Sequence, residues 1–150
     1  MTDGTLICLT GNELGVHATT KELRYAAMRY AEQHLIGSEF TNTDSGHTVK
    51  VTRQGMKHSL SNKNNPEVRI SVGLAQILTG ASYAGSKPPT DKHAQRGIVA
   101  MHRYIAKVRL GEEEFAVGVV THERSGGHEH YDHAIVANGV KGAERLGRIL

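Results

Sequence analysis

The sequence of 150 residues lacks the features that mark several specialised classes of protein. Its single cysteine, Cys8, excludes an intrachain disulfide framework and a cysteine-based zinc ribbon. Tryptophan is absent and aromatic residues make up 5% of the chain, so there are few stacking platforms for single-stranded nucleic acid. No apolar run approaches the roughly 20 residues that a membrane helix needs. The start, Met1 to Gly4, lacks the basic and apolar parts of a signal peptide, and we expect a cytoplasmic protein without a membrane partner.

The charged and histidine content is more informative. Eighteen Lys and Arg against fifteen Asp and Glu give a net charge of +3, and ten histidines add further cationic capacity below neutral pH. This balance permits a polyanionic partner without requiring one. The length fits a single domain, which we place at residues 1–138, followed by a C-terminal tail at residues 139–150.

Local patterns predict helices first and strands later. Thr19 and Glu22 have the spacing of a capping box, and Gly37 provides a stop, so a helix is expected over residues 20–36. Pro66 opens a second helix after Asn65, and Gly80 ends it. The remaining expected elements are a strand at 6–9, a hairpin at 39–41 and 47–52, a loop at 53–65, a long connection at 81–95, and meander strands at 100–110, 114–123 and 128–137.

Strand pairing predicts which side chains share a sheet face. A two-residue turn at Gly111–Glu112 sets Val108 opposite Phe115, and a four-residue loop sets Glu123 opposite His128 in the next hairpin. One face is then apolar and covered by helices: Tyr104, Ala106, Val108, Phe115, Val117, Val119, Ala134 and Val136. The other face collects Arg103, Lys107, Arg109, His122, Tyr131 and His133 around Gly118. That face is either an anion or phosphodiester site or simply a solvated surface.

Two segments carry most of the chemically active side chains. The run from His128 to His133 holds three histidines and two carboxylates, but its spacing matches no standard closed zinc site, and we expect neither a metal nor a cofactor. The expected loop at 53–65 holds Lys57, His58, Ser59 and Lys63. A histidine among hydroxyls and lysines suits acid–base work on a phosphodiester, although an ordinary polar loop has the same composition.

The order of several short motifs resembles a known family, the third family of large polyvalent protein-associated domains, found in long phage and mobile-element proteins. The motifs are Thr10–Gly15, Lys21–Ala27, Thr43–Gly46 before an alternating strand, Gly55–Ser61, and Gly126–Gly127 before Tyr131–His133. That family is placed in the barnase–EndoU–colicin–RelE-like superfamily, whose members are mostly metal-independent ribonucleases acting as toxins. The resemblance implies an α+β fold with N-terminal helices packed on a four-stranded antiparallel β-meander.

The combined expectation is a toxin-type endoribonuclease that needs no metal and acts in a host cell or a phage particle. The expected catalytic residues are His58, His133, Tyr131 and Arg103, and the expected substrate-binding residues are Lys57, Ser59, Lys63, Lys107, Arg109 and His122. RNA is the expected partner, together with an immunity protein or a phage protein. The alternative is a catalytically silent module that binds nucleic acid or protein.

Overall fold

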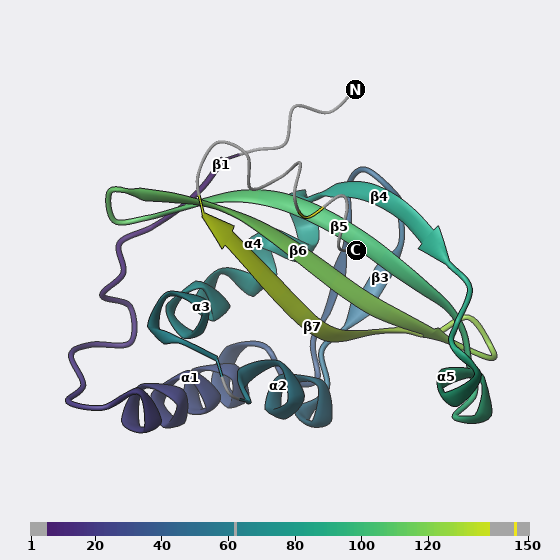
Figure 1. Cartoon of the computed structure of the whole chain (residues 1–150), viewed down its shortest axis with the longest axis horizontal. Helices are drawn as coiled ribbons and strands as arrows, with labels where there is room; N and C mark the ends of the chain where they lie inside the picture. The colour runs from purple at the N-terminus through teal and green to yellow at the C-terminus, as the bar shows by residue number, and fades with distance from the viewer. Residues whose placement is uncertain (1–5, 62, 139–145, 147–150) are drawn as a thin grey trace.

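The computed structural model describes residues 6–61, 63–138 and 146. Its helices are α1 (Thr20–His34), α2 (Arg53–Leu60), α3 (Asn65–Ile70), the 3-10 turn η1 (Ser71–Gly73), α4 (Leu74–Gly80) and α5 (Asp91–Gln95). Its strands are β1 (Leu6–Leu9), β2 (Glu39–Thr41), β3 (Thr48–Lys50), β4 (Ser82–Lys87), β5 (Ile98–Leu110), β6 (Glu113–Arg124) and β7 (Glu129–Asn138). The long strands β5, β6 and β7 run the length of the molecule, and α1, α2 and α3 lie together on one side of them (Figure 1).

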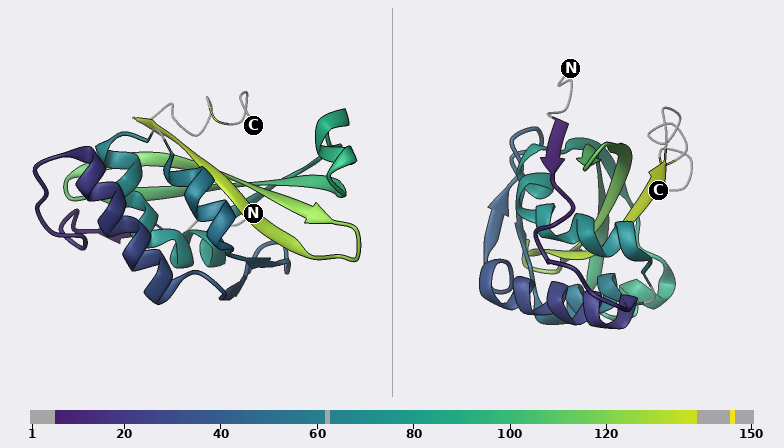
Figure 2. Two further views of the ribbon diagram at one scale, coloured as in Figure 1. Left: turned by 90° about the horizontal axis from the view of Figure 1, so that it is seen from below. Right: turned by 90° about the vertical axis from the view of Figure 1, so that its left-hand side faces the viewer.

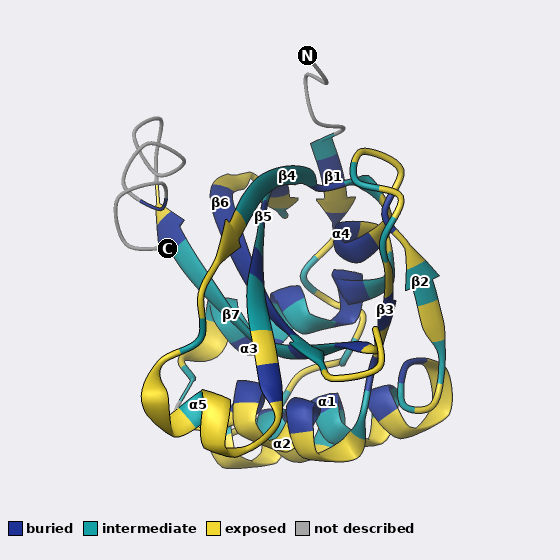
Figure 3. Ribbon diagram, turned by 90° about the vertical axis from the view of Figure 1, so that its right-hand side faces the viewer, coloured by how far each residue is buried: buried dark blue, intermediate teal, exposed yellow. Residues whose placement is uncertain are grey.

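All seven strands belong to one mixed sheet. Six of them follow the order β1-β5-β6-β7-β3-β2, and β4 pairs with the half of β5 that β1 does not reach. β1 runs parallel to β5 and β3 runs parallel to β7, whereas the remaining pairs are antiparallel. The sheet curls into a half-barrel, seen end-on in Figure 3. The expected four-stranded antiparallel meander is therefore wrong. The meander β5–β6–β7 exists, but short strands from distant parts of the chain extend it on both sides.

The helices cover the apolar face of the sheet, as the sequence pattern predicted. α1 presents Leu23, Ala27 and Ala31 at helical spacing to the sheet, and its first turn is capped by Thr19, whose Oγ1 accepts a hydrogen bond from the amide of Glu22. Figure 2 shows α1 and α2 side by side beneath the strands. Tyr104, Ala106, Val108, Phe115, Val117 and Val119 are buried in this main core, with Ala134 and Val136 packed against it, as predicted.

The first hairpin register is confirmed and the second is wrong. Val108 lies opposite Phe115, as the two-residue turn requires. In the second hairpin Glu123 lies opposite Glu129, and Val117 lies opposite Val136 rather than Ala134. Val120 pairs with His133, and the next residue, Thr121, pairs with Tyr131. Asp132 is therefore an extra, bulged residue in β7. This bulge puts His133 and Tyr131 on opposite faces of the sheet.

The face away from the helices does not have the predicted hollow at Gly118. Gly118 itself is buried, opposite Ile105 and Ile135. A second apolar cluster fills this region, made of Ala116, Val120, Ala137 and Leu146 with Met101, Ile105 and Ile135 packed against it. Leu146 comes from the expected tail, which otherwise lies outside the described residues. Much of this face is therefore a small second core.

Two segments expected to be irregular are ordered elements. The predicted loop at 53–65 contains α2, and the predicted long connection at 81–95 contains β4 and α5. The second helix is interrupted, because α3 and α4 are separated by the 3-10 turn η1. None of the helices in the described part of the chain is long and apolar enough to span a lipid bilayer.

Candidate functional site

A cleft of about 420 Å³ lies between α2, α5 and the neighbouring ends of β6 and β7. It is lined by four histidines, whereas the larger hollow along α1 is lined by one. Its lining residues are Thr52, Gln54, Gly55, His58, His93, Arg96, His122, Arg124, His130, Tyr131 and Asp132. A polar cleft with several convergent ionisable groups is a default candidate for a binding or catalytic site.

The helix α2 brings His58 to the rim of this cleft. Thr52 caps the helix, because its side chain accepts a hydrogen bond from the amide of Gly55. Gly55 lies against the carbonyl oxygen of Tyr131 in β7, so closely that a Cβ atom there would collide with it. This contact seats α2 directly on β7, with Met56 buried beneath the helix and His58 exposed on the other side.

Three imidazoles surround the carboxylate of the bulged residue Asp132. His133 Nδ1 lies 2.6 Å from Asp132 Oδ2, His122 Nε2 lies 3.5 Å away, and His58 Nε2 lies 3.7 Å away. Partial burial acts to raise the pKa of Asp132, but the hydrogen bond from His133 and the three imidazoles outweigh it and lower the pKa. Asp132 is therefore ionised at neutral pH and fixes the orientation of His133.

His122 forms the floor of the cleft and is 8% exposed. Its Nε2 atom is buried and has no hydrogen-bond partner among the described residues. Burial lowers the pKa of His122, which outweighs the attraction of Asp132. His122 is therefore less easily protonated than an exposed histidine.

Cationic side chains reach the cleft from α5 and the end of β6. Arg96 follows α5 and is exposed, while Arg124 ends β6 and donates a hydrogen bond to the carbonyl oxygen of Arg96. The ring of His93 on α5 lies 5.0 Å from that of His122. α5 is held at this end of the sheet by the hydrogen bond from the amide of Ser125 to the carbonyl oxygen of Gly97. The cleft thus combines imidazoles, one carboxylate and two guanidinium groups.

Three of the sequence-predicted site residues meet here, and Tyr131 is not available to a substrate. His58, His122 and His133 converge on Asp132, whereas Tyr131 is 4% exposed and its side chain lies in the main core. Its hydroxyl hydrogen-bonds to Ser59 Oγ, which is also buried. Burial raises the pKa of Tyr131 well above its usual value, so its phenol stays protonated. The prediction that Tyr131 lies on the exposed face is wrong, because the bulge at Asp132 turns it inward.

We expect Tyr131→Phe to weaken the fold without changing the chemistry of the cleft. The substitution leaves the buried Ser59 hydroxyl without its partner, which costs about 1–3 kcal/mol in the free energy of unfolding. Urea unfolding measures this loss, and Ser59→Ala in the same chain should recover part of it by removing the unpaired hydroxyl. Unchanged stability of folded Tyr131→Phe would mean that this buried hydrogen bond does not support the fold.

The other predicted cationic residues are not gathered around the cleft. Arg103 donates hydrogen bonds from Nη2 to the carbonyl oxygen of Ala84 and from Nε to that of Gly85, toward β4. Lys107 and Arg109 are exposed farther along β5, where Arg109 lies 3.8 Å from Glu114. Lys63 donates to the carbonyl oxygen of Ala134. Lys57 is exposed on α2 beside His58.

Five ionisable residues of the cleft were not selected from the sequence: His93, Arg96, Arg124, His130 and Asp132. Asp132 stood in the histidine-rich segment, but only the bulge aims its carboxylate at three imidazoles. His93 and Arg96 lie in the segment interpreted as a long connection. The sequence Thr90-Asp91 before Lys92 and His93 was the available signal, since Thr90 caps α5 by accepting a hydrogen bond from the amide of His93.

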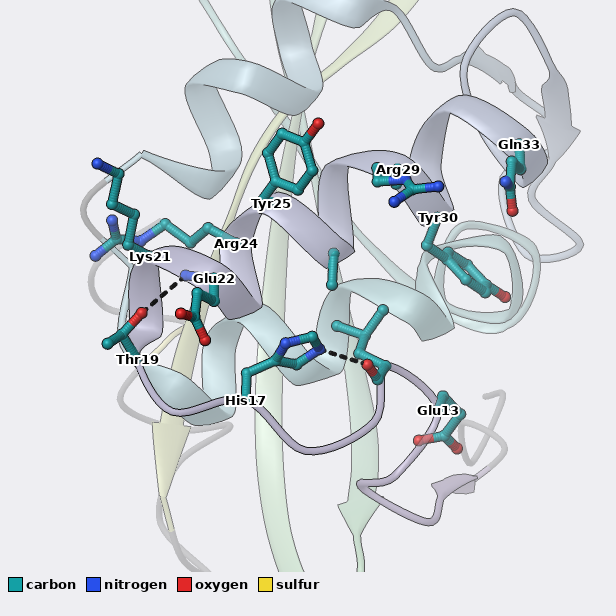
Figure 4. Close-up of a pocket in the computed structure, with 12 residues that line it drawn as sticks. Glu13, His17, Thr19, Lys21, Glu22, Arg24, Tyr25, Arg29, Tyr30 and Gln33 are labelled. Atoms are coloured by element: carbon teal, nitrogen blue, oxygen red, sulfur yellow. Dashed lines mark hydrogen bonds between the residues drawn. The ribbon is translucent and has the colours of Figure 1, made fainter.

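A larger hollow of about 970 Å³ lies along α1 and the loop before it (Figure 4). Two of its polar side chains, Glu13 and His17, are occupied in holding that loop. His17 Nε2 hydrogen-bonds to the carbonyl oxygen of Leu14, and the carboxylate of Glu13 accepts from the amides of Thr10 and Gly11. Figure 4 shows Tyr25 and Arg29 spread along the helix rather than converging. This hollow therefore lacks the convergent chemistry of the cleft at Asp132.

Two groups of side chains among the described residues have the spacing to hold a metal ion. One is His58, Asp132 and His133 in the cleft, and the other is His47, His102 and Glu129 on the helix-covered face. In each group the ligand atoms lie within 4.8 Å of one another. In the cleft, His133 Nδ1 already shares a close hydrogen bond with Asp132, an arrangement that orients an imidazole for proton transfer.

Comparison with known proteins identifies a family for this chain. The model of the family described as large polyvalent protein-associated domain 3 matches residues 18–131, well over half of the chain. No curated protein and no solved structure matches this chain. The matched segment includes His58, His122 and Arg124 and ends directly before Asp132 and His133. The chain therefore belongs to the large polyvalent protein-associated domain 3 family.

Proposed function

We propose that the chain is an endoribonuclease that cleaves RNA at the cleft around Asp132 by acid–base transesterification, without a metal. The observation that carries the proposal is the convergence of His58 and His133 on one carboxylate. Their ring centroids are 5.9 Å apart, so a phosphodiester bound beside the two rings can meet both imidazoles. The proposal agrees with the ribonuclease activity implied by the expected placement of this family in the barnase–EndoU–colicin–RelE-like superfamily.

The reaction requires two proton transfers. One imidazole accepts the proton of the ribose 2′-hydroxyl, whose oxygen attacks the adjacent phosphorus. The other donates a proton to the leaving 5′-oxygen, which gives a 2′,3′-cyclic phosphate and a free 5′-hydroxyl. Asp132 holds His133 through Nδ1 and leaves its Nε2 for the substrate. Arg96 and Arg124 supply positive charge for the phosphate as negative charge develops on it.

The direct test is cleavage of a fluorescently labelled RNA in EDTA, with separation of the products. We expect cleavage to persist under chelation and to yield cyclic phosphate ends. A matched oligonucleotide with 2′-deoxyribose at the scissile position should remain intact, because it lacks the attacking hydroxyl. Cleavage that stops in EDTA and returns with added metal would overturn the metal-independent mechanism. Binding of RNA without cleavage under any condition would favour the catalytically silent binding module.

RNA binding should weaken steeply as the salt concentration rises, because each phosphate neutralised by the cleft releases counterions. With an uncleavable 2′-deoxy-substituted oligonucleotide, we expect Arg96→Ala to reduce the slope of log K against log salt by about 0.7 to 1. Fluorescence anisotropy at several salt concentrations measures this slope. Arg109→Ala is the matched control, since Arg109 pairs with Glu114 away from the cleft. A larger change for Arg109→Ala than for Arg96→Ala would move the contact surface to the outer part of β5.

A further inference from the structure

A second cluster of ionisable side chains lies on the helix-covered face of the sheet. It comprises His47 before β3, His102 on β5, Glu123 at the end of β6 and Glu129 at the start of β7. His102 and Glu129 are each 6% exposed. The neighbouring pair His122 and His130 points to the opposite face, so this cluster is separate from the cleft at Asp132.

The distances within the cluster match those of a tetrahedral metal site. His47 Nδ1 lies 3.4 Å from Glu129 Oε1, and His102 Nε2 lies 3.5 Å from the same oxygen. In a tetrahedral zinc site with bond lengths of about 2.1 Å, neighbouring ligand atoms are about 3.4 Å apart. Glu123 Oε1 is closer, 2.7 Å from His102 Nε2, but its side chain is 35% exposed and can rotate outward. These four side chains therefore present a nearly formed ligand set.

The charges of the cluster also favour a cation. With neutral imidazoles, Glu123 and Glu129 together carry two negative charges, which one divalent ion neutralises. Glu129 is an almost fully buried carboxylate, and its ion-pair partners among the described residues are the imidazoles of His47 and His102. Buried charge is costly unless it is paired or bound to a metal. A mixture of two imidazoles and two carboxylates suits zinc better than magnesium or calcium, which prefer oxygen ligands.

Residues around the cluster fix the ligands in place. Tyr104, 1% exposed, donates a hydrogen bond to Glu129 Oε2 at 2.9 Å. The hydroxyl of Tyr83 lies 2.8 Å from His102 Nδ1, so His102 can donate from Nδ1 while Nε2 binds a metal. The turn that carries His47 is held by the buried Asn42, which donates to the carbonyl oxygens of Leu78 and Ala81. Such support holds the ligands of metal sites in their binding geometry.

We propose that His47, His102, Glu129 and Glu123 form a zinc site. The ion takes the place of the proton between His102 Nε2 and the two carboxylates. His47, whose side chain is 38% exposed, lies at the entrance. The sequence could not reveal this site through ligand spacing, because its ligands come from four separate segments. The site is independent of the proposed cleavage chemistry, and either proposal can fail without the other.

The experiment is zinc titration of the untagged, metal-free full chain against a chromogenic chelator. It is done in a His58→Ala/His133→Ala background, which removes two of the three possible ligands in the cleft. We expect one zinc per chain, a higher Tm with zinc and no change with magnesium. Cobalt in place of zinc should give the intense visible absorption of tetrahedral coordination. Absence of stoichiometric zinc binding, or an octahedral cobalt spectrum, overturns the proposal.

Single substitutions assign the ligands. Glu129→Gln should abolish stoichiometric binding while keeping the shape and the hydrogen bond from Tyr104. His47→Ala, in a partly exposed turn, gives a second ligand variant that should remain folded and lose zinc affinity by about 100-fold or more. Tyr83→Phe should lower the affinity by about 10-fold, the effect of losing an outer partner of a ligand. Circular dichroism checks each fold, and unchanged zinc affinity in folded Glu129→Gln and His47→Ala would refute this ligand set.

Discussion

Replacing either His58 or His133 with alanine is expected to slow RNA cleavage by about a hundredfold or more. A positioned acid or base contributes about 10²- to 10⁴-fold to such a reaction, and each substitution removes one of the two proton-transfer groups. Because the two imidazoles act in one reaction, their effects on the rate are not independent. The double variant should therefore cleave RNA much faster than the product of the two single-variant effects would give. The measurement is the single-turnover rate with a labelled RNA in EDTA.

The controls come from the same strand and its turn. His128→Ala should leave the rate nearly unchanged, since His128 is exposed in the turn before β7. Asp132→Asn should slow cleavage by removing the carboxylate that holds His133 Nδ1, while preserving the size of the side chain. Thermal melting of each variant separates a chemical effect from a folding defect. If His128→Ala is inactive and His133→Ala is fully active, the site at Asp132 is wrong.

Part of this site could be predicted from the sequence, because the polar segment at 53–65 selected His58 and the expected strand faces selected His122 and His133. Their convergence depended on a feature that patterning does not show. In an unbroken strand Tyr131 and His133 would share a face, since side chains alternate. The bulge at Asp132 breaks that alternation, so that Tyr131 is buried while His133 lies beside Asp132 and His58. Nothing in the run of residues 128–133 marks which residue is the extra one.

The fold was predictable where its contacts are local. The first meander hairpin has a two-residue turn and matching apolar pairs, so its register follows from the sequence. The mixed sheet depends on contacts between distant segments: β1 pairs with residues 107–110, and β3 pairs with residues 129–130. Each of these pairings involves only two to four residues, too few for a pattern to identify the partner. An antiparallel meander was therefore expected where a mixed half-barrel forms.

The short helix α2 was missed for a different reason. It has eight residues, and its buried side is made of Gly55, Met56, Ser59 and Leu60. Two of these four residues are not hydrophobic, so the helix lacks a clear apolar stripe in the sequence. Its stability comes from packing against β7 and α1 rather than from its own propensity. Residues 53–65 were consequently expected to form a loop.

Met56→Ala should lower the free energy of unfolding by about 2–5 kcal/mol, the usual cost of truncating a buried methionine. Met56 is 1% exposed and belongs to the main core, so its loss leaves a cavity beneath α2. The same change should slow cleavage, because α2 carries His58 to within 3.7 Å of Asp132. Urea unfolding gives the stability, and Lys57→Ala, on the exposed side of the helix, should change it by no more than about 0.5 kcal/mol. Equal and small effects of the two substitutions would mean that residues 53–60 form a solvated loop, and His58 would then lose its support in the cleft.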